Sequence, residues 1–101
     1  MPFCRSKCGY CDFASAPGTP ADIDAYLDAL AAESSLYDGL SGGFDTLYVG
    51  GGTPSLLSTA QLARLCGVIG TLTGPLAALR ERTFEANPES MDAAKAALLK
   101  E

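Results

Sequence analysis

The stretch FDTLYVGGG, from Phe44 to Gly52, carries the clearest strand signal in the chain. Its first six residues are rich in aromatic and β-branched side chains, and three glycines end the run abruptly. This pattern predicts a strand that enters a glycine-rich loop, over residues 44–55. Backbone without side chains leaves room for a ligand to approach closely. Ligands of open α/β sheets bind at this carboxyl end of the strands.

Three amphipathic patterns flank this strand and predict helices. Two of them begin with a hydroxyl side chain at the N-cap, Thr19 before a proline and Ser58 three residues before Gln61. The third begins at Ser90. Apolar residues then recur at intervals of three and four, as on one buried face of a helix. The predicted helices span 19–38, 58–73 and 90–101.

A second strand and its following loop are predicted over 82–89, where RTFEA precedes Asn87 and Pro88. Strands that alternate with helices indicate an α/β protein with a parallel sheet. Two strands are too few for a stable parallel sheet, which normally has both faces covered. The pattern therefore predicts the first units of a larger α/β domain, truncated in this chain. We expect the isolated chain to associate, to aggregate or to bind its ligands poorly.

The composition narrows the classes of function. Twelve acidic and seven basic residues give a net charge of −5, which argues against binding of nucleic acid through phosphate contacts. The chain has no His, so a metal would have to be bound by thiolates and carboxylates. No apolar run approaches the roughly 20 residues of a membrane span, and no secretory signal precedes the cysteines. These features favour a cytoplasmic protein in a reducing compartment.

Three of the four cysteines stand together in the segment 1–13. Cys4, Cys8 and Cys11 have the spacing C-x3-C-x2-C, which lets three thiolates converge on one centre. Their bunching at one end is unlike a secreted disulfide scaffold, whose cysteines are spread along the chain. The cluster of thiols therefore predicts a metal site.

The spacing alone leaves two kinds of metal open. A closed zinc site takes four ligands, and the fourth would have to be Cys66, on the apolar face of a predicted helix, or come from a partner chain. An iron–sulfur cluster with one iron left open needs only the three clustered cysteines. Arg5 and Lys7 would favour the thiolate form and offset the negative charge of such a cluster.

Taken together, three motifs resemble the radical S-adenosylmethionine superfamily. They are CRSKCGYCDF from Cys4, GGGTPS from Gly50 and EANP from Glu85, in the order of that superfamily. Within it they are most similar to the oxygen-independent coproporphyrinogen III oxidase-like family. The resemblance covers essentially the whole chain, and it implies the amino-terminal βα units of a partial (β/α)6 barrel.

The resemblance also implies a role for each matching residue. Cys4, Cys8 and Cys11 would bind three irons of a [4Fe-4S] cluster, and S-adenosylmethionine would bind the fourth iron. Tyr10 would lie against the adenine of S-adenosylmethionine, and Glu85 would form a hydrogen bond with its ribose.

The glycine-rich loop would bind the other end of the same cofactor. Gly51, Gly52 and Thr53 would contact the methionine moiety. In such proteins an electron donor reduces the cluster, which cleaves S-adenosylmethionine to a 5′-deoxyadenosyl radical that abstracts hydrogen from a substrate. The protein would ligate and orient the cofactors and exclude water.

One position separates two branches of the family. The oxidases have a further cysteine two residues after the third one, and this chain has Phe13 there. This residue resembles the heme chaperone branch, which binds heme or porphyrin and delivers heme to acceptor proteins. The alternatives are an oxidase that decarboxylates the propionates of coproporphyrinogen, or a non-functional truncated fragment. Whether the chain acts as an enzyme is open at this point.

Overall fold

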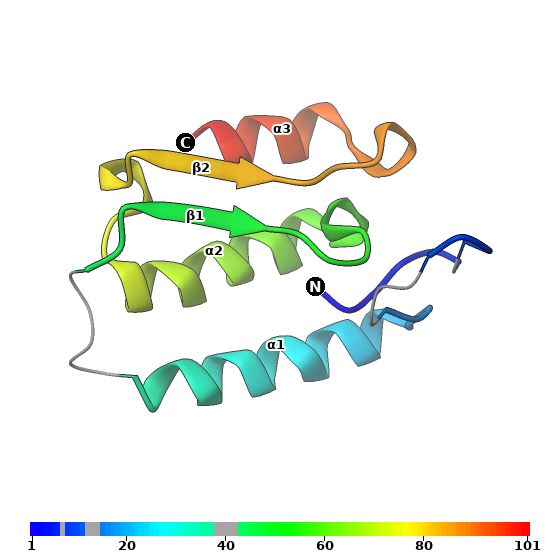
Figure 1. Ribbon diagram of the computed structural model, residues 1–101, viewed down its shortest axis with the longest axis horizontal. Coiled ribbons are helices and arrows are strands. Elements are labelled where there is room, and N and C mark those ends of the chain that lie inside the picture. Colours follow the sequence, from blue (N-terminus) through cyan, green and yellow to red (C-terminus); the bar gives the residue numbers. More distant parts are fainter. Residues whose placement is uncertain (7, 12–14, 38–42) are drawn as a thin grey trace.

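The structure is a computed structural model that describes residues 1–6, 8–11, 15–37 and 43–101. Its elements are α1 (Pro20–Ser35), β1 (Thr46–Val49), η1 (Pro54–Leu56), α2 (Thr59–Thr73), η2 (Leu76–Ala78), β2 (Glu81–Phe84), η3 (Pro88–Ser90) and α3 (Ala93–Lys100). The η elements are single turns of 3-10 helix. The described part of the chain is a small α/β domain with three α-helices and a two-stranded parallel sheet (Figure 1). None of these helices combines the length and the hydrophobicity that crossing a membrane requires.

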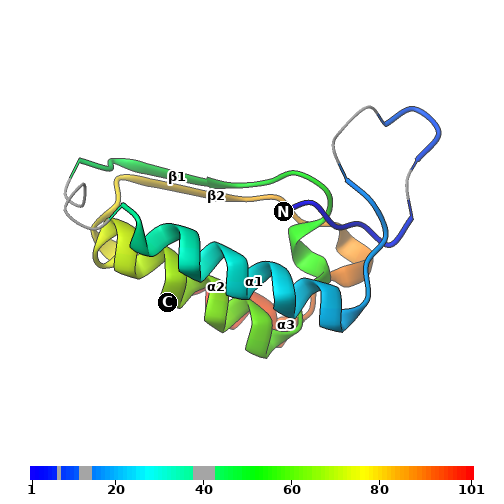
Figure 2. The same ribbon diagram turned by 90° about the horizontal axis from the view of Figure 1, so that it is seen from below.

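The two strands pair in parallel, with Thr46 opposite Glu81 and Val49 opposite Phe84. All three helices lie on the same side of this sheet (Figure 2). Both strands are shorter than the sequence pattern predicts. Pairing starts beyond Asp45, whose carbonyl oxygen accepts from the amide of Arg80 at 2.8 Å, so the predicted strand start at residue 44 lies outside the sheet.

The starts of the first two helices agree with the predicted caps. At α1, the Thr19 hydroxyl accepts from the Asp22 amide at 3.1 Å, and the Asp22 carboxylate accepts from the Thr19 amide at 2.8 Å. At α2, Ser58 and Gln61 form the same reciprocal pair, at 3.2 and 3.0 Å. Each pair satisfies two amides that a helix start would otherwise leave without a partner.

The end of α1 differs from its prediction. The helix ends at Ser35 rather than at residue 38, and Asp38 itself lies outside the described residues. The reason is a tighter last turn, in which the Leu36 amide donates to the Glu33 carbonyl at 3.0 Å. Such three-residue turns commonly replace the last α-helical bonds at a helix terminus.

The predicted start of the last helix at Ser90 is wrong. α3 begins at Ala93, because Asp92 is its N-cap and accepts from the Lys95 amide at 2.9 Å. Ser90 ends the preceding turn η3, and its hydroxyl contacts Ser55 instead. A carboxylate at this N-cap is also favoured by the positive end of the helix dipole.

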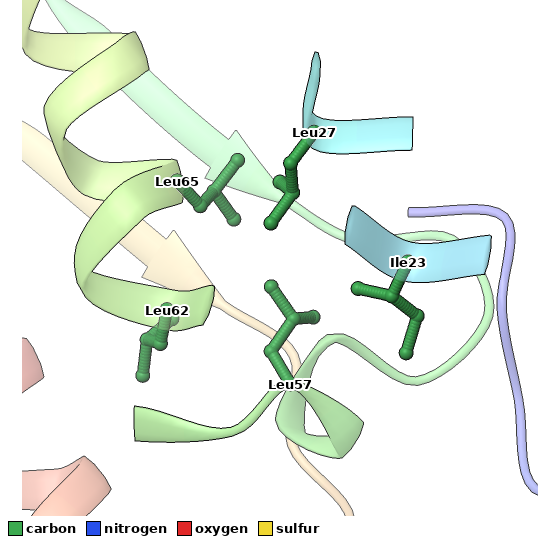
Figure 3. Close-up of a cluster of buried hydrophobic side chains, with 5 residues drawn as sticks. All are labelled: Ile23, Leu27, Leu57, Leu62 and Leu65. Carbon is green, nitrogen blue, oxygen red and sulfur yellow. The ribbon is translucent and has the colours of Figure 1, made fainter. Parts of the chain in front are cut away.

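The hydrophobic core lies between α1, α2 and the segment that follows η1 (Figure 3). Its five buried side chains are Ile23, Leu27, Leu57, Leu62 and Leu65. Burial of each contributes about 2 kcal/mol by its apolar area. Leu57 matters most for the site, because it follows the glycine-rich loop by only a few residues and is 1% exposed. The core therefore anchors that loop.

Candidate cofactor site

The residues that the sequence singles out lie around one cavity of about 360 Å³. Three segments form it, the amino-terminal segment and the loops that follow β1 and β2, which lie at the same end of the domain (Figure 1). The predicted residues in its lining are Cys4, Cys8, Tyr10, Cys11, Gly51, Gly52, Thr53 and Glu85. The sequence did not single out Ser15 and Leu56, which also line the cavity.

The three clustered cysteines are free thiols with different degrees of burial. Cys4 is buried, Cys11 is half-buried and Cys8 is exposed. Within residues 1–6, 8–11, 15–37 and 43–101, no three His, Cys, Asp or Glu side chains form a group that could hold a metal ion. The segment brings the thiols to one cavity without gathering them into a metal site.

This donor set nevertheless fits an iron–sulfur cluster. Three free thiols and no imidazole line the cavity, and thiolates are the ligands that iron–sulfur clusters use. In a metal site the bound metal itself supplies the free energy that gathers the ligands.

Cys4 is held in place by backbone pairing at the base of its segment. The Cys4 amide donates to the Ala16 carbonyl at 3.2 Å, and the Ala16 amide donates to the Pro2 carbonyl at 2.9 Å. The ring of Phe3 packs edge-on against Tyr26 of α1, with centroids 5.7 Å apart. These contacts fix one thiol of the three against the body of the domain.

Two glycines of the GGGTPS motif make room for the backbone of the amino-terminal segment. The Gly52 amide donates to the Met1 carbonyl at 2.6 Å. A Cβ atom at Gly52 would lie 2.2 Å from the Phe3 carbonyl oxygen, and one at Gly51 would lie 2.4 Å from that of Met1. Gly51 also has a φ of +115°, which side chains disfavour. Close packing against the amino-terminal segment therefore requires glycine at these two positions, independently of the predicted contact with a ligand.

Glu85 bridges the carboxyl ends of both strands. Its carboxylate accepts from the Tyr48 hydroxyl and, at 3.3 Å, from the Gly51 amide. Tyr48 was missed by the sequence analysis. The signal was its place between Leu47 and Val49, because alternation puts a tyrosine between two half-buried residues on the opposite face of the strand.

The contact with Glu85 should be visible in the titration of Tyr48. The hydrogen bond to the carboxylate raises the pKa of Tyr48 above its ordinary value near 10. Its contribution to stability is therefore full below pH 10 and is lost as the pH rises through the raised pKa. We expect Glu85→Gln to lower the Tyr48 pKa, measured by NMR of tyrosine ring carbons.

The matched control for this titration is Glu81→Gln, which removes an equal charge from an exposed side chain of β2, the strand that Glu85 follows. It should leave the Tyr48 titration unchanged. A Tyr48 midpoint that Glu85→Gln does not move would contradict the contact.

Cys66 lies apart from the other three cysteines. It lines a separate apolar groove with residues such as Leu62, Phe84 and Leu98. Burial raises the pKa of the Cys66 thiol, which keeps it protonated near neutral pH. Its place in a different groove from the other three thiols disfavours Cys66 as the fourth ligand of a zinc site.

Charge around the cysteines comes in part from Arg5, which lines the cavity and pairs with Glu89 at 3.6 Å. Both side chains are largely exposed, so this pair contributes little to stability. Lys7, which was expected to act with Arg5, lies outside the described residues. So does Phe13, on which the distinction between the two family branches depends.

The amino-acid sequence of this chain is similar to those of several named proteins. The chain is 39% identical over 103 residues to the heme chaperone HemW of Bacillus subtilis and 44% identical over 88 residues to that of Lactococcus lactis. It is 33% identical over 98 residues to the bovine mitochondrial protein named radical S-adenosyl methionine domain-containing protein 1. These matches cover 100%, 87% and 95% of this chain.

The same matches cover 27%, 22% and 22% of the relatives, so the chain spans about a quarter of their length. No family model and no solved structure matches the chain. Over the matched segment, the chain belongs to the radical S-adenosylmethionine proteins. Within them it belongs to the family of the heme chaperone HemW.

Proposed function

We propose that this chain is the cofactor-binding part of a heme chaperone that carries a [4Fe-4S] cluster and S-adenosylmethionine. The observation that supports this most directly is the meeting of three sequence motifs around one cavity at the carboxyl ends of the strands. The names of the similar proteins support heme as the cargo. Delivery of heme to an acceptor protein, an electron donor and a cytoplasmic location belong to the same proposal.

In this proposal Cys4, Cys8 and Cys11 hold the cluster. When bound, the cluster supplies one-electron chemistry toward S-adenosylmethionine. Tyr10 lines the cavity, is 90% exposed and would lie against the adenine. The Glu85 carboxylate, half-buried at the cavity wall, would accept a hydrogen bond from the ribose.

The glycine-rich loop supplies the remaining cofactor contacts in this proposal. Gly51, Gly52 and Thr53 line the cavity and would meet the methionine moiety of S-adenosylmethionine. Their amides already donate to Glu85, Met1 and Phe3. Their carbonyl oxygens would therefore be the groups that approach the ammonium of the methionine moiety, without a side chain between them.

We further propose that the domain is the amino-terminal part of a partial (β/α)6 barrel. Helices on only one side of a parallel sheet are what a barrel requires, because its strands surround an interior and its helices form the outer layer. The cavity then opens toward the carboxyl ends of the strands, the usual place for the active site of such barrels.

The proposal is tested by anaerobic reconstitution with iron and sulfide of the chain within the longer barrel protein proposed above, because the chain by itself is expected to bind its ligands poorly. We expect about four irons per chain, binding of S-adenosylmethionine by calorimetry, and retention of heme on gel filtration. An assay for 5′-deoxyadenosine separates the two family branches. Heme retention without 5′-deoxyadenosine supports the chaperone. Formation of 5′-deoxyadenosine with loss of carboxyl groups from coproporphyrinogen, or failure to bind heme, would overturn it.

A further inference from the structure

Behind the cavity, a group of polar contacts joins the loop after β1 to the loop after β2. Its centre is Ser55 in η1, which is 1% exposed. The Ser55 hydroxyl oxygen accepts from the Asn87 amide at 2.9 Å and lies 2.6 Å from the hydroxyl oxygen of Ser90. The Ser90 hydroxyl lies 3.3 Å from the Asn87 carbonyl oxygen.

One placement of the hydroxyl protons gives both serine hydroxyls of this group a hydrogen-bond acceptor. An amide can only donate, so the Asn87 N–H occupies an acceptor site on Ser55. When the Ser55 O–H donates to Ser90, the Ser90 O–H can donate to the Asn87 carbonyl. This closed ring leaves no buried hydroxyl without a partner, which is the condition for a stable polar contact inside a protein.

A single cation strengthens the ring. The Lys95 ammonium, in the first turn of α3, donates to the Ser55 carbonyl at 2.8 Å and to the Ser90 carbonyl at 2.7 Å. Hydrogen bonds from a charged donor are shorter and stronger than those between neutral groups. One half-buried ammonium thus holds the two loops at a fixed separation.

The separation of these two loops sets the width of the cavity. The first loop contributes Gly51, Gly52 and Thr53 to its lining. The second contributes Glu85, Asn87 and Ser90. The ladder between β1 and β2 ends where the Glu85 amide donates to the Val49 carbonyl. Beyond that point, strand pairing does not hold the loops together.

We propose that Ser55, Ser90 and Lys95 form a loop clamp whose members are positioning residues for S-adenosylmethionine. Ser55 and Lys95 do not line the cavity, and Ser90 lies at its wall. Together they would hold the two binding loops at the separation that the ligand requires. This inference rests on the proposed function. It predicts that loosening the clamp weakens binding of S-adenosylmethionine more than it weakens the fold.

The test compares Lys95→Met with Lys100→Met in the reconstituted chain. Both remove one cation from α3, and Lys100 is exposed at its far end. Lys95→Met should weaken binding of S-adenosylmethionine, measured by calorimetry, about tenfold, which corresponds to about 1.4 kcal/mol. Lys100→Met should bind normally. Lys95→Arg keeps a cation that can reach both carbonyls and should recover most of the lost affinity.

A second variant, Ser55→Ala, keeps the charge and opens the hydroxyl ring. Hydrogen exchange of the Asn87 amide should accelerate in this variant even without any cofactor, because its acceptor is gone. If the unsubstituted chain, Lys95→Met and Ser55→Ala bind S-adenosylmethionine with equal affinity, the loop clamp is wrong and the proposed function still stands. An equal loss of affinity in Lys100→Met would overturn the loop clamp as well. Failure of the unsubstituted chain to bind S-adenosylmethionine would overturn the proposed function and the clamp together.

Discussion

Serine in place of Cys4, Cys8 or Cys11 is expected to abolish binding of the iron–sulfur cluster. The ligand of iron is a thiolate, and a serine hydroxyl stays protonated near neutral pH. With only three cysteines at the cavity, each loss leaves two ligands. Iron bound after anaerobic reconstitution should fall from about four per chain to nearly none.

Cys66→Ser is the matched control for these variants, because it removes a thiol that lines a different groove. It should retain the full iron content. If Cys66→Ser also loses its metal, the metal is bound by four thiolates and the proposal of three ligands is wrong. Bound zinc in place of iron and sulfide, measured by mass spectrometry of the metals, would point to the same correction.

Gly52→Ala is expected to destabilise the chain, because the added methyl group meets the backbone of the amino-terminal segment. The new Cβ would lie 2.2 Å from the Phe3 carbonyl oxygen, which belongs to backbone that has to shift. We expect a loss of about 2–3 kcal/mol, as for overpacking of a filled site, measured by urea unfolding followed by circular dichroism. Because Phe3 precedes Cys4, the shift should also lower the iron content after reconstitution.

The control for this effect is Gly67→Ala in the middle of α2, where nothing lies within 4 Å of the added methyl group. Alanine favours the helix over glycine by about 0.5–1 kcal/mol, so this variant should be more stable than the parent chain. If Gly52→Ala unfolds at the same urea concentration as the parent chain, the close approach of the amino-terminal segment to the loop is contradicted.

Local sequence signals were enough to predict how α1 and α2 begin and that the loops after the two strands lie at one edge of the sheet. A capping box joins residues only three apart, so its residue types specify it with little help from the rest of the chain. Parallel pairing of β1 and β2 brings both strand ends to one edge. The GGGTPS and EANP motifs could therefore be assigned to one site from their positions after predicted strands.

The contacts that shape the site were not readable in this way. Tyr48 reaches Glu85 across 37 positions, and Ser55 reaches Asn87 across 32. Ser90 carries the residue type of a helix cap, yet its hydroxyl serves the loop clamp while Asp92 caps α3. Such pairs depend on how strands, turns and helices pack against one another, and residue type and spacing carry no record of that packing. Local hydrogen bonding thus set the elements and the motifs of this chain, whereas long-range packing set the width and the walls of its cavity.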